Sequence, residues 1–292
     1  MNTQNTMHYT HNYLINPTNP IRANLIGAGG TGSRMLTELA RMNRSLIALG
    51  HAGLQVNLFD DDVVTNVNQG RQLFADAKVG LPKAVALINR TNRFFGTNWK
   101  AVTEQFSTAN LKSVPNRGRA NLYVSYLDTA KASFDIADFL LKCNANSDFE
   151  RTKSLYWLNL GNARNTGQVI LSTISEIQQP DSKLYSTVPS LPMVTDEFKE
   201  LLQAQSDTSE PSCSLTEALE KQDLFINAAL ASMGASLFSK LFREGMPPHR
   251  GFFLNLANFR SETIMVGVIA ARPAIPARWS RNCGALLFGI PS

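Results

Sequence analysis

The segment Asn24–Ser33, "NLIGAGGTGS", joins a short apolar run to a glycine-rich turn. The apolar run predicts a buried strand, and residues 34–50 carry apolar side chains at helical spacing. Glycine has no Cβ atom, so the backbone between strand and helix can turn tightly and approach a phosphate. The segment therefore predicts a nucleotide-binding strand–loop–helix unit. Its glycines are Gly27, Gly29, Gly30 and Gly32.

This unit does not choose among NAD, FAD and ATP, because all three present phosphates to such a loop. The loop lacks a Walker A lysine, so a P-loop nucleotidase is not supported. The structural alternative is a plain tight turn between a strand and a helix.

Strand-like and helix-like segments alternate over residues 21–175. This alternation predicts a doubly wound, Rossmann-like α/β fold whose mainly parallel sheet is covered by helices on both faces. We expect residues 1–20 to form an N-terminal arm and residues 21–292 to form a single domain. Within that domain, the proline-containing segment 176–212 predicts a long crossover loop. A helix over 215–243 and a hairpin of two antiparallel strands are expected to follow.

Bulk composition limits the classes of function. The 292 residues are 43% hydrophobic and 17% charged, which is typical of a soluble globular protein. The net charge of +5 comes from scattered basic residues, so no nucleic-acid partner is expected. No apolar run reaches about 18 residues and no signal segment is evident, which favours a cytoplasmic protein without a membrane partner. The three cysteines form no CxxC pair, so neither a structural zinc site nor a disulfide framework is expected.

The segment Asp60–Phe74, "DDDVVTNVNQGRQLF", brings many polar groups to the end of the second predicted strand. Asp60 and Asp62 can bind ribose hydroxyls, with a solvated acidic turn as the alternative. Asp60 follows the last glycine of the loop by 28 residues, more than the roughly 20 expected of a nicotinamide enzyme. Arg71 and Lys83 are two cations that suit a triphosphate. The alternative for this pair is a surface salt bridge to the acids and a lysine at a helix end.

Two further residues are candidates for chemistry. Asp128 is expected at the carboxyl end of the fourth strand, where a carboxylate can hold Mg²⁺ beside a triphosphate or simply cap the next helix. Cys213 precedes Ser214 and Glu217, whose spacing predicts a capping box. A helix N-terminus stabilises a thiolate, so Cys213 is a candidate nucleophile, with a buried unreactive thiol as the alternative.

The ordered stretches "GAGGTGS", "DDDVV", "NQGRQLF", "KVGLPKA" and "LD" resemble the motifs of the ThiF/MoeB-like adenylyltransferases, bacterial relatives of ubiquitin-activating enzymes. Further stretches, among them "YWLNLGN" and "EPSCSLTEALEKQDLFIN", are most similar to the ThiF-family member of the PRTRC plasmid-associated gene system. The resemblance covers most of the chain. The sequence departs from the family at Thr129 and Lys131, where asparagine and arginine are common, and it lacks the paired CxxC zinc ligands of many relatives.

The resemblance implies adenylation, dependent on ATP and Mg²⁺, of the C-terminal glycine of a small ubiquitin-like or sulfur-carrier-like protein. It implies that the four glycines cradle the ATP phosphates, that Asp60 and Asp62 bind the ribose and that Asp128 holds Mg²⁺. Cys213 would carry the activated carboxylate as a thioester. The polar residues that would face the triphosphate are Asn68, Arg71, Gln72 and Lys83. The family also implies a homodimer.

Two other classes of function stay open. An NAD(P)-dependent oxidoreductase would share the glycine loop, but it predicts one acid after the second strand and no arginine–lysine pair. A non-catalytic ThiF-fold binding module would bind a partner without forming AMP or pyrophosphate, and the departures at Thr129 and Lys131 are compatible with it.

Overall fold

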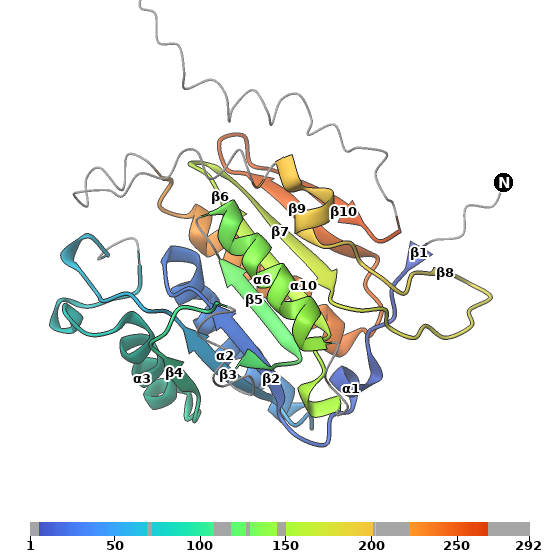
Figure 1. The fold of residues 1–292 in the computed structure, drawn as a ribbon, viewed down its shortest axis with the longest axis horizontal. Coiled ribbons are helices and arrows are strands. Elements are labelled where there is room, and N and C mark those ends of the chain that lie inside the picture. Colours follow the sequence, from blue (N-terminus) through green and yellow to red (C-terminus); the bar gives the residue numbers. More distant parts are fainter. Residues whose placement is uncertain are drawn as a thin grey trace, which may run out of the picture.

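The computed structural model describes residues 6–68, 72–107, 118–126, 129–144, 150–200, 202 and 222–267. An eight-stranded mixed sheet has the order β10-β9-β7-β6-β5-β2-β3-β4 (Figure 1). Its strands are β2 (Ile21–Ile26), β3 (Leu54–Phe59), β4 (Lys100–Val102), β5 (Leu122–Tyr126), β6 (Tyr156–Asn162), β7 (Thr166–Thr173), β9 (His249–Asn255) and β10 (Arg260–Met265). The helices that flank it are α2 (Gly30–Ala48), α3 (Lys83–Phe95), α6 (Ala130–Asn144), α7 (Val194–Glu197) and α10 (Ile226–Arg243).

The five strands from β4 to β6 run parallel to one another, and β7, β9 and β10 continue the sheet in antiparallel fashion. The central strand β2 pairs with β3 on one side and with β5 on the other. The carboxyl ends of β2, β3 and β5 therefore meet at one edge, where ligands bind in open α/β sheets. The predicted Rossmann-like α/β fold with a mainly parallel sheet and an antiparallel C-terminal hairpin is confirmed.

Two apolar layers hold the helices on the sheet. Alternate strand residues such as Leu25 and Val124 are fully buried with α2 and α10 on one face. Residues of opposite orientation, such as Phe59 and Tyr123, are buried with α6 on the other face. Figure 1 shows α6 in front of the sheet with α2 and α10 behind it. This division follows from the period of two in a strand, which sends successive side chains to opposite faces.

The first described residues pack on the body of the protein. β1 (Thr6–Met7) pairs with β8 (Ser186–Thr187), and α1 (Asn12–Ile15) buries Leu14 completely. His8 is also fully buried, with Nε2 lying 2.9 Å from the Tyr156 hydroxyl. Residues 1–20 were expected to form an arm, and the described part of that arm contributes to the core.

The segment expected as a crossover loop, 176–212, is described up to residue 200 and at residue 202. Its described part contains β8 and α7, and it buries Ile177, Leu191 and Val194. Ile177 and Leu191 belong to the apolar layer shared with α2 and α10, and Val194 belongs to the layer shared with α6. The segment is therefore in part a covering layer of the sheet.

The helix expected over residues 215–243 falls within the described ranges only from residue 222. The helix expected from residue 215 begins, within its described part, at Ile226, because Asp223 Oδ1 accepts the N–H groups of Phe225 and Ile226 at 2.8 and 3.0 Å. The third parallel strand in chain order, β4, is short and covers only Lys100–Val102. α3 begins at Lys83, directly after Pro82, and Gly80 just before it has φ +86°, a backbone conformation that interrupts a helix. No helix in the described ranges is long and apolar enough to cross a membrane.

Candidate functional site

The glycine loop lies between β2 and α2, at the carboxyl end of the central strand. Gly27 has φ +95°, and a Cβ atom there would lie 2.6 Å from the carbonyl oxygen of Tyr126. A Cβ atom at Gly32 would lie only 1.9 Å from the carbonyl oxygen of Gly27. The loop is thus folded back onto its own helix and onto β5 more closely than any side chain allows.

Helix α2 opens directly from this loop. It begins at Gly30 after Gly29, and neither residue has a side chain that could cap the first N–H groups of the helix. The first turn also carries no acidic residue. Free N–H groups and the positive end of the helix dipole together favour an anion at this position. Gly27, Gly29, Gly30 and Gly32 form a close-packed turn at this helix N-terminus, and their binding of phosphates stays a prediction.

Asp60 connects the end of β3 to the glycine loop. Its Oδ2 accepts the N–H of Ala28 at 2.6 Å, and its Oδ1 accepts the N–H of Asp62 at 3.1 Å. Burial raises the pKa of the Asp60 carboxyl above its usual value, while the hydrogen bond from Ala28 and the charge of Lys83 oppose this rise. A carboxylate accepts about four hydrogen bonds, so Asp60 keeps capacity for hydroxyl groups of a ligand.

Lys83 and Asp62 join the next helix to the same site. Lys83 is the first residue of α3, its Nζ lies 2.7 Å from Asp62 Oδ2, and its N–H donates to the Asp62 carbonyl oxygen at 2.9 Å. The lysine side chain is 9% exposed and the aspartate side chain is 67% exposed. A cation at a helix N-terminus is electrostatically unfavourable. The ion pair relieves that cost, as the salt-bridge alternative expected, and it also holds a buried ammonium group beside the acidic turn.

Asn68 and Gln72 have different surroundings from those expected. Asn68 Oδ1 accepts from the N–H and the hydroxyl of Thr65 at 2.8 and 3.1 Å, so this oxygen closes its own short turn, η1 (Asn66–Asn68). Gln72 is 8% exposed, and its Oε1 is buried with no hydrogen-bond partner in the structure. Buried polar atoms are nearly always paired. The Gln72 side chain is therefore the member of this motif with an unmet hydrogen-bonding requirement.

A polar network that the motifs did not identify lies beside the glycine loop. Asn227, from the first turn of α10, accepts from the Thr31 hydroxyl at 2.7 Å and from Asn162 Nδ2 at 2.8 Å. The hydroxyl of Tyr126, at the end of β5, donates in turn to Asn162 Oδ1. Asn227 Nδ2 donates to Gln222 Oε1 at 3.0 Å, which supplies the partners that a buried asparagine needs. The network joins the ends of β5 and β6 to α2 and α10.

Gly30 allows this network to form. A Cβ atom at Gly30 would lie 2.5 Å from Asn227 Nδ2. The sequence signal that could have found the network is the placement of Tyr126 and Asn162 at the ends of predicted strands, where polar residues commonly serve a ligand site.

Three predicted catalytic residues, Arg71, Asp128 and Cys213, lie outside the described residues. Within the described part of the chain, no group of three or more His, Cys, Asp or Glu residues is arranged to hold a metal ion. Cys143 is buried in α6, and burial raises the pKa of its thiol, which keeps it protonated and unreactive. The described site thus consists of the glycine cradle, Asp60, the Lys83–Asp62 pair, Gln72 and the Asn227 network.

Comparisons with known proteins identify a family and a shared fold. The model of the ThiF family matches residues 19–276. The solved structure of PaaA shares 16% sequence identity with a TM-score of 0.55, covering 84% of this chain and 64% of that chain. E. coli MccB with selenomethionine MccA shares 16% identity with a TM-score of 0.53, covering 87% and 65%. E. coli MccB with ATP shares 15% identity with a TM-score of 0.51, also covering 87% and 65%.

The chain spans less than two thirds of the length of each of these solved chains. At such identities the likeness shows a shared fold. Among curated proteins, none matches the chain at a significant level.

Proposed function

The chain belongs to the ThiF family, and from this premise we propose that it is an adenylyltransferase that transfers AMP from ATP to the C-terminal carboxylate of a small protein or peptide. One observation carries the proposal: the Asp60 carboxylate is hydrogen-bonded to the glycine loop, and the buried Lys83 ammonium is paired beside it. Under this proposal, the Asp60 carboxylate would bind the ribose, the glycine loop would bind the phosphates and the Lys83 ammonium would offset their charge.

The described residues fit ATP. Gly27 and Gly32 leave backbone exposed where any Cβ atom would collide with a carbonyl group, and the N–H groups of α2 point to that loop. Asp60 is held by Ala28 and can accept the ribose hydroxyls with its remaining lone pairs. Gln72, Asn68 and Arg71 follow Asp60 in the chain, and we assign them to the polyphosphate as the family motif implies.

Lys83 would act through charge. The Lys83 ammonium lies 2.7 Å from the Asp62 carboxylate, and the Asp62 side chain is 67% exposed. A triphosphate can therefore replace this carboxylate as the partner of Lys83 without leaving a buried acid unpaired. A lysine at the start of a helix adds to the positive potential of the free N–H groups there. We therefore expect Lys83 to bind the polyphosphate and to stabilise the negative charge that grows on the leaving pyrophosphate.

In the proposed reaction, a carboxylate oxygen of the partner attacks the α-phosphorus of ATP. The bond from that phosphorus to the oxygen bridging to the β-phosphorus breaks, and pyrophosphate leaves with the electron pair. The product is a mixed anhydride of the carboxylate and AMP. Asp128 would hold Mg²⁺, which supplies neutralisation of phosphate charge when bound. Lys83 and Arg71 would orient the leaving group throughout.

The partner, the later steps and the setting belong to the same proposal. E. coli MccB has been crystallised with MccA, which supports a small protein or peptide as the acceptor. We assign a ubiquitin-like or sulfur-carrier-like protein with a C-terminal glycine, thioester transfer to Cys213, and a homodimeric cytoplasmic enzyme of the PRTRC subtype. The buried thiol of Cys143 is a poor alternative to Cys213, because burial disfavours its thiolate.

Exchange of labelled pyrophosphate into ATP tests the function directly. The full chain is incubated with ATP, Mg²⁺ and each member of a panel of small proteins that end in glycine. Exchange should appear with the correct partner and disappear when the terminal glycine of that partner is removed. Titrations with ATP and with NADH run in parallel, and tight NADH binding with weak ATP binding would refute the adenylyltransferase assignment.

A further inference from the structure

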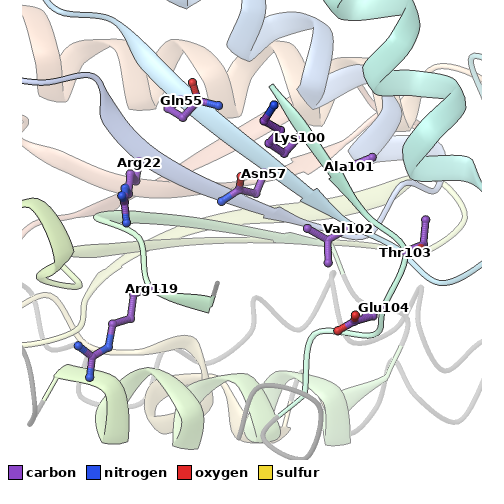
Figure 2. Close-up of a pocket in the computed structure, with 9 residues that line it drawn as sticks. All are labelled: Arg22, Gln55, Asn57, Lys100, Ala101, Val102, Thr103, Glu104 and Arg119. Carbon is purple, nitrogen blue, oxygen red and sulfur yellow. The ribbon is translucent and has the colours of Figure 1, made fainter. Parts of the chain in front are cut away.

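A second polar pocket lies away from the glycine loop, over the face of the sheet that α6 partly covers. Its volume is about 530 Å³. The charged and amide side chains that line it are Arg22, Gln55, Asn57, Lys100, Glu104 and Arg119. Figure 2 shows Arg22 and Arg119 on one side of the pocket, with Lys100 and the amides along its floor and Glu104 at the opposite side. The pocket therefore spans β2, β3 and β4, and Arg119 joins it from three residues before the start of β5.

The floor of this pocket is unusual for a parallel sheet. Strands covered by helices on both faces are almost continuously apolar. Here Arg22 is in register with Gln55, and Asn57 is in register with both Asn24 and Lys100, so five polar residues share one face of three adjacent strands.

Closer to the carboxyl ends of the strands, the same face becomes apolar. Ile26 and Phe59 belong there to the cluster that α6 buries. The polar half of the face is therefore a surface distinct from this apolar cluster.

The pocket has an excess of positive charge. Three cations, Arg22, Lys100 and Arg119, face one acid, Glu104. Across the described ranges, none of the three cations forms an ion pair. Arg119 Nε is in addition buried without a hydrogen-bond partner. Arg22 and Arg119 are half-buried and Lys100 is exposed. Because no acid within the described ranges neutralises these three cations, the arrangement favours an anionic ligand.

The amide groups on the floor of the pocket favour a ligand that carries hydrogen-bond donors. Asn57 Nδ2 donates to Asn24 Oδ1 at 3.0 Å, and Gln55 Nε2 donates to the Asn98 carbonyl oxygen at 3.0 Å. These two bonds orient the amides, and the amide oxygens keep capacity to accept from a ligand. A ligand matched to the pocket would thus combine negative groups with hydroxyl or N–H donors.

We propose that this pocket binds a small anion with two or more negative charges, carried on phosphate or carboxylate groups, that also presents hydrogen-bond donors. Its volume lies within the usual range of small-molecule sites, about 300 to 1,000 Å³. Arginine forks recognise both carboxylate and phosphate in bidentate geometry. The site is separate from the glycine cradle: Arg22 precedes Gly27 by five residues, which is roughly 16 Å along an extended strand.

Calorimetric titration of the full chain with citrate and with inorganic phosphate tests the proposal and distinguishes the two ligand chemistries. A saturating non-hydrolysable ATP analogue is present in one series, so that the glycine loop is occupied and cannot account for the signal. The test variant is Arg22→Gln combined with Arg119→Gln. The control variant is Arg44→Gln, which removes an exposed arginine of α2 outside the pocket. Circular dichroism checks that each variant is folded.

We expect at least one probe to bind the unmodified chain and the Arg44→Gln control equally, and to bind the double variant at least about tenfold more weakly. Lys100→Gln, at an exposed position, serves if the double variant does not fold, and it should weaken the same probe several-fold. The proposal is overturned if neither probe binds, if binding survives in the folded variants, or if the control loses as much affinity. Because these titrations need no partner protein and no exchange activity, their failure leaves the adenylyltransferase assignment untouched.

Discussion

Substitution of Gly32 by alanine should disable the nucleotide cradle. The new methyl carbon would lie 1.9 Å from the Gly27 carbonyl oxygen, and an ordinary contact of this kind is about 3.3 Å, so one group must move by about 1.4 Å. Neither can move freely, because the Gly27 N–H donates to the Phe59 carbonyl oxygen at 2.9 Å and the Ala28 N–H donates to Asp60 at 2.6 Å. The shift therefore displaces the N–H groups that would bind phosphate.

The expected magnitudes follow from that displacement. Overpacking of this kind costs about 1 to 3 kcal/mol of unfolding free energy. Loss of two charge-assisted hydrogen bonds to phosphate costs about 3 kcal/mol or more, which is roughly a hundredfold in the Kd for ATP. Urea unfolding measures the first quantity and calorimetric titration with ATP measures the second.

Gly29→Ala is the matched control in the same loop. Gly29 has φ −70°, and a Cβ atom there would meet nothing nearer than the Tyr126 ring at 3.9 Å. We expect its unfolding free energy to stay within about 0.5 kcal/mol of the unmodified chain. A Gly32→Ala protein that is equally stable and binds ATP with unchanged affinity would refute the close-packed cradle described above.

Three further predictions concern charged groups. Lys83→Gln should weaken ATP binding about tenfold, as measured by titration. Its effect on the free energy of unfolding should stay below about 1 kcal/mol, because the partner carboxylate is exposed. An unchanged Kd for ATP would show that this lysine does not bind the polyphosphate. Because the pKa of Asp60 is raised in the folded state, its contribution to stability is full below its unfolded value, 3.8, and is lost as the pH rises through the folded value. Urea midpoints should therefore fall with rising pH in this range more steeply for the unmodified chain than for Asp60→Asn, and parallel curves would contradict the assignment. Arg250→Met should destabilise the chain by about 3 to 5 kcal/mol, since it leaves Glu197 buried and unpaired, and the double change with Glu197→Leu should restore most of that loss in the same unfolding assay.

The local pattern of the chain was sufficient for the general architecture. Apolar runs such as Leu54–Phe59 and helical spacing such as that in α2 are properties of neighbouring residues, so they were visible before any tertiary structure. The glycine loop could be identified for the same reason, because a strand, a tight turn and a helix follow one another directly. The ends of helices were harder to predict from the sequence. α10 begins at Ile226 because one side chain, Asp223, accepts the N–H groups of Phe225 and Ile226.

For the candidate site too, the sequence identified individual residues, whereas only the tertiary structure showed their partners. The sequence motifs identified Asp60 and Lys83, but they could not show that Asp60 is bonded to Ala28, 32 residues earlier, or that Lys83 is paired with Asp62. For the lysine, the salt-bridge interpretation and the phosphate interpretation were equally open, and the observed pair is compatible with both.

By itself, the sequence determined the strand–glycine–helix unit, the mainly parallel α/β fold and the set of polar residues after β3, because each depends on residues close together in the chain. Only the tertiary structure decided that Asn227, 196 residues beyond Thr31, completes the wall of the glycine loop, and that Arg22, Lys100 and Arg119 share one pocket. These contacts depend on the order and register in which β2, β3, β4 and β5 pair and on the helices that cover them. That order is set by the burial of the whole core, which no local pattern of residues records.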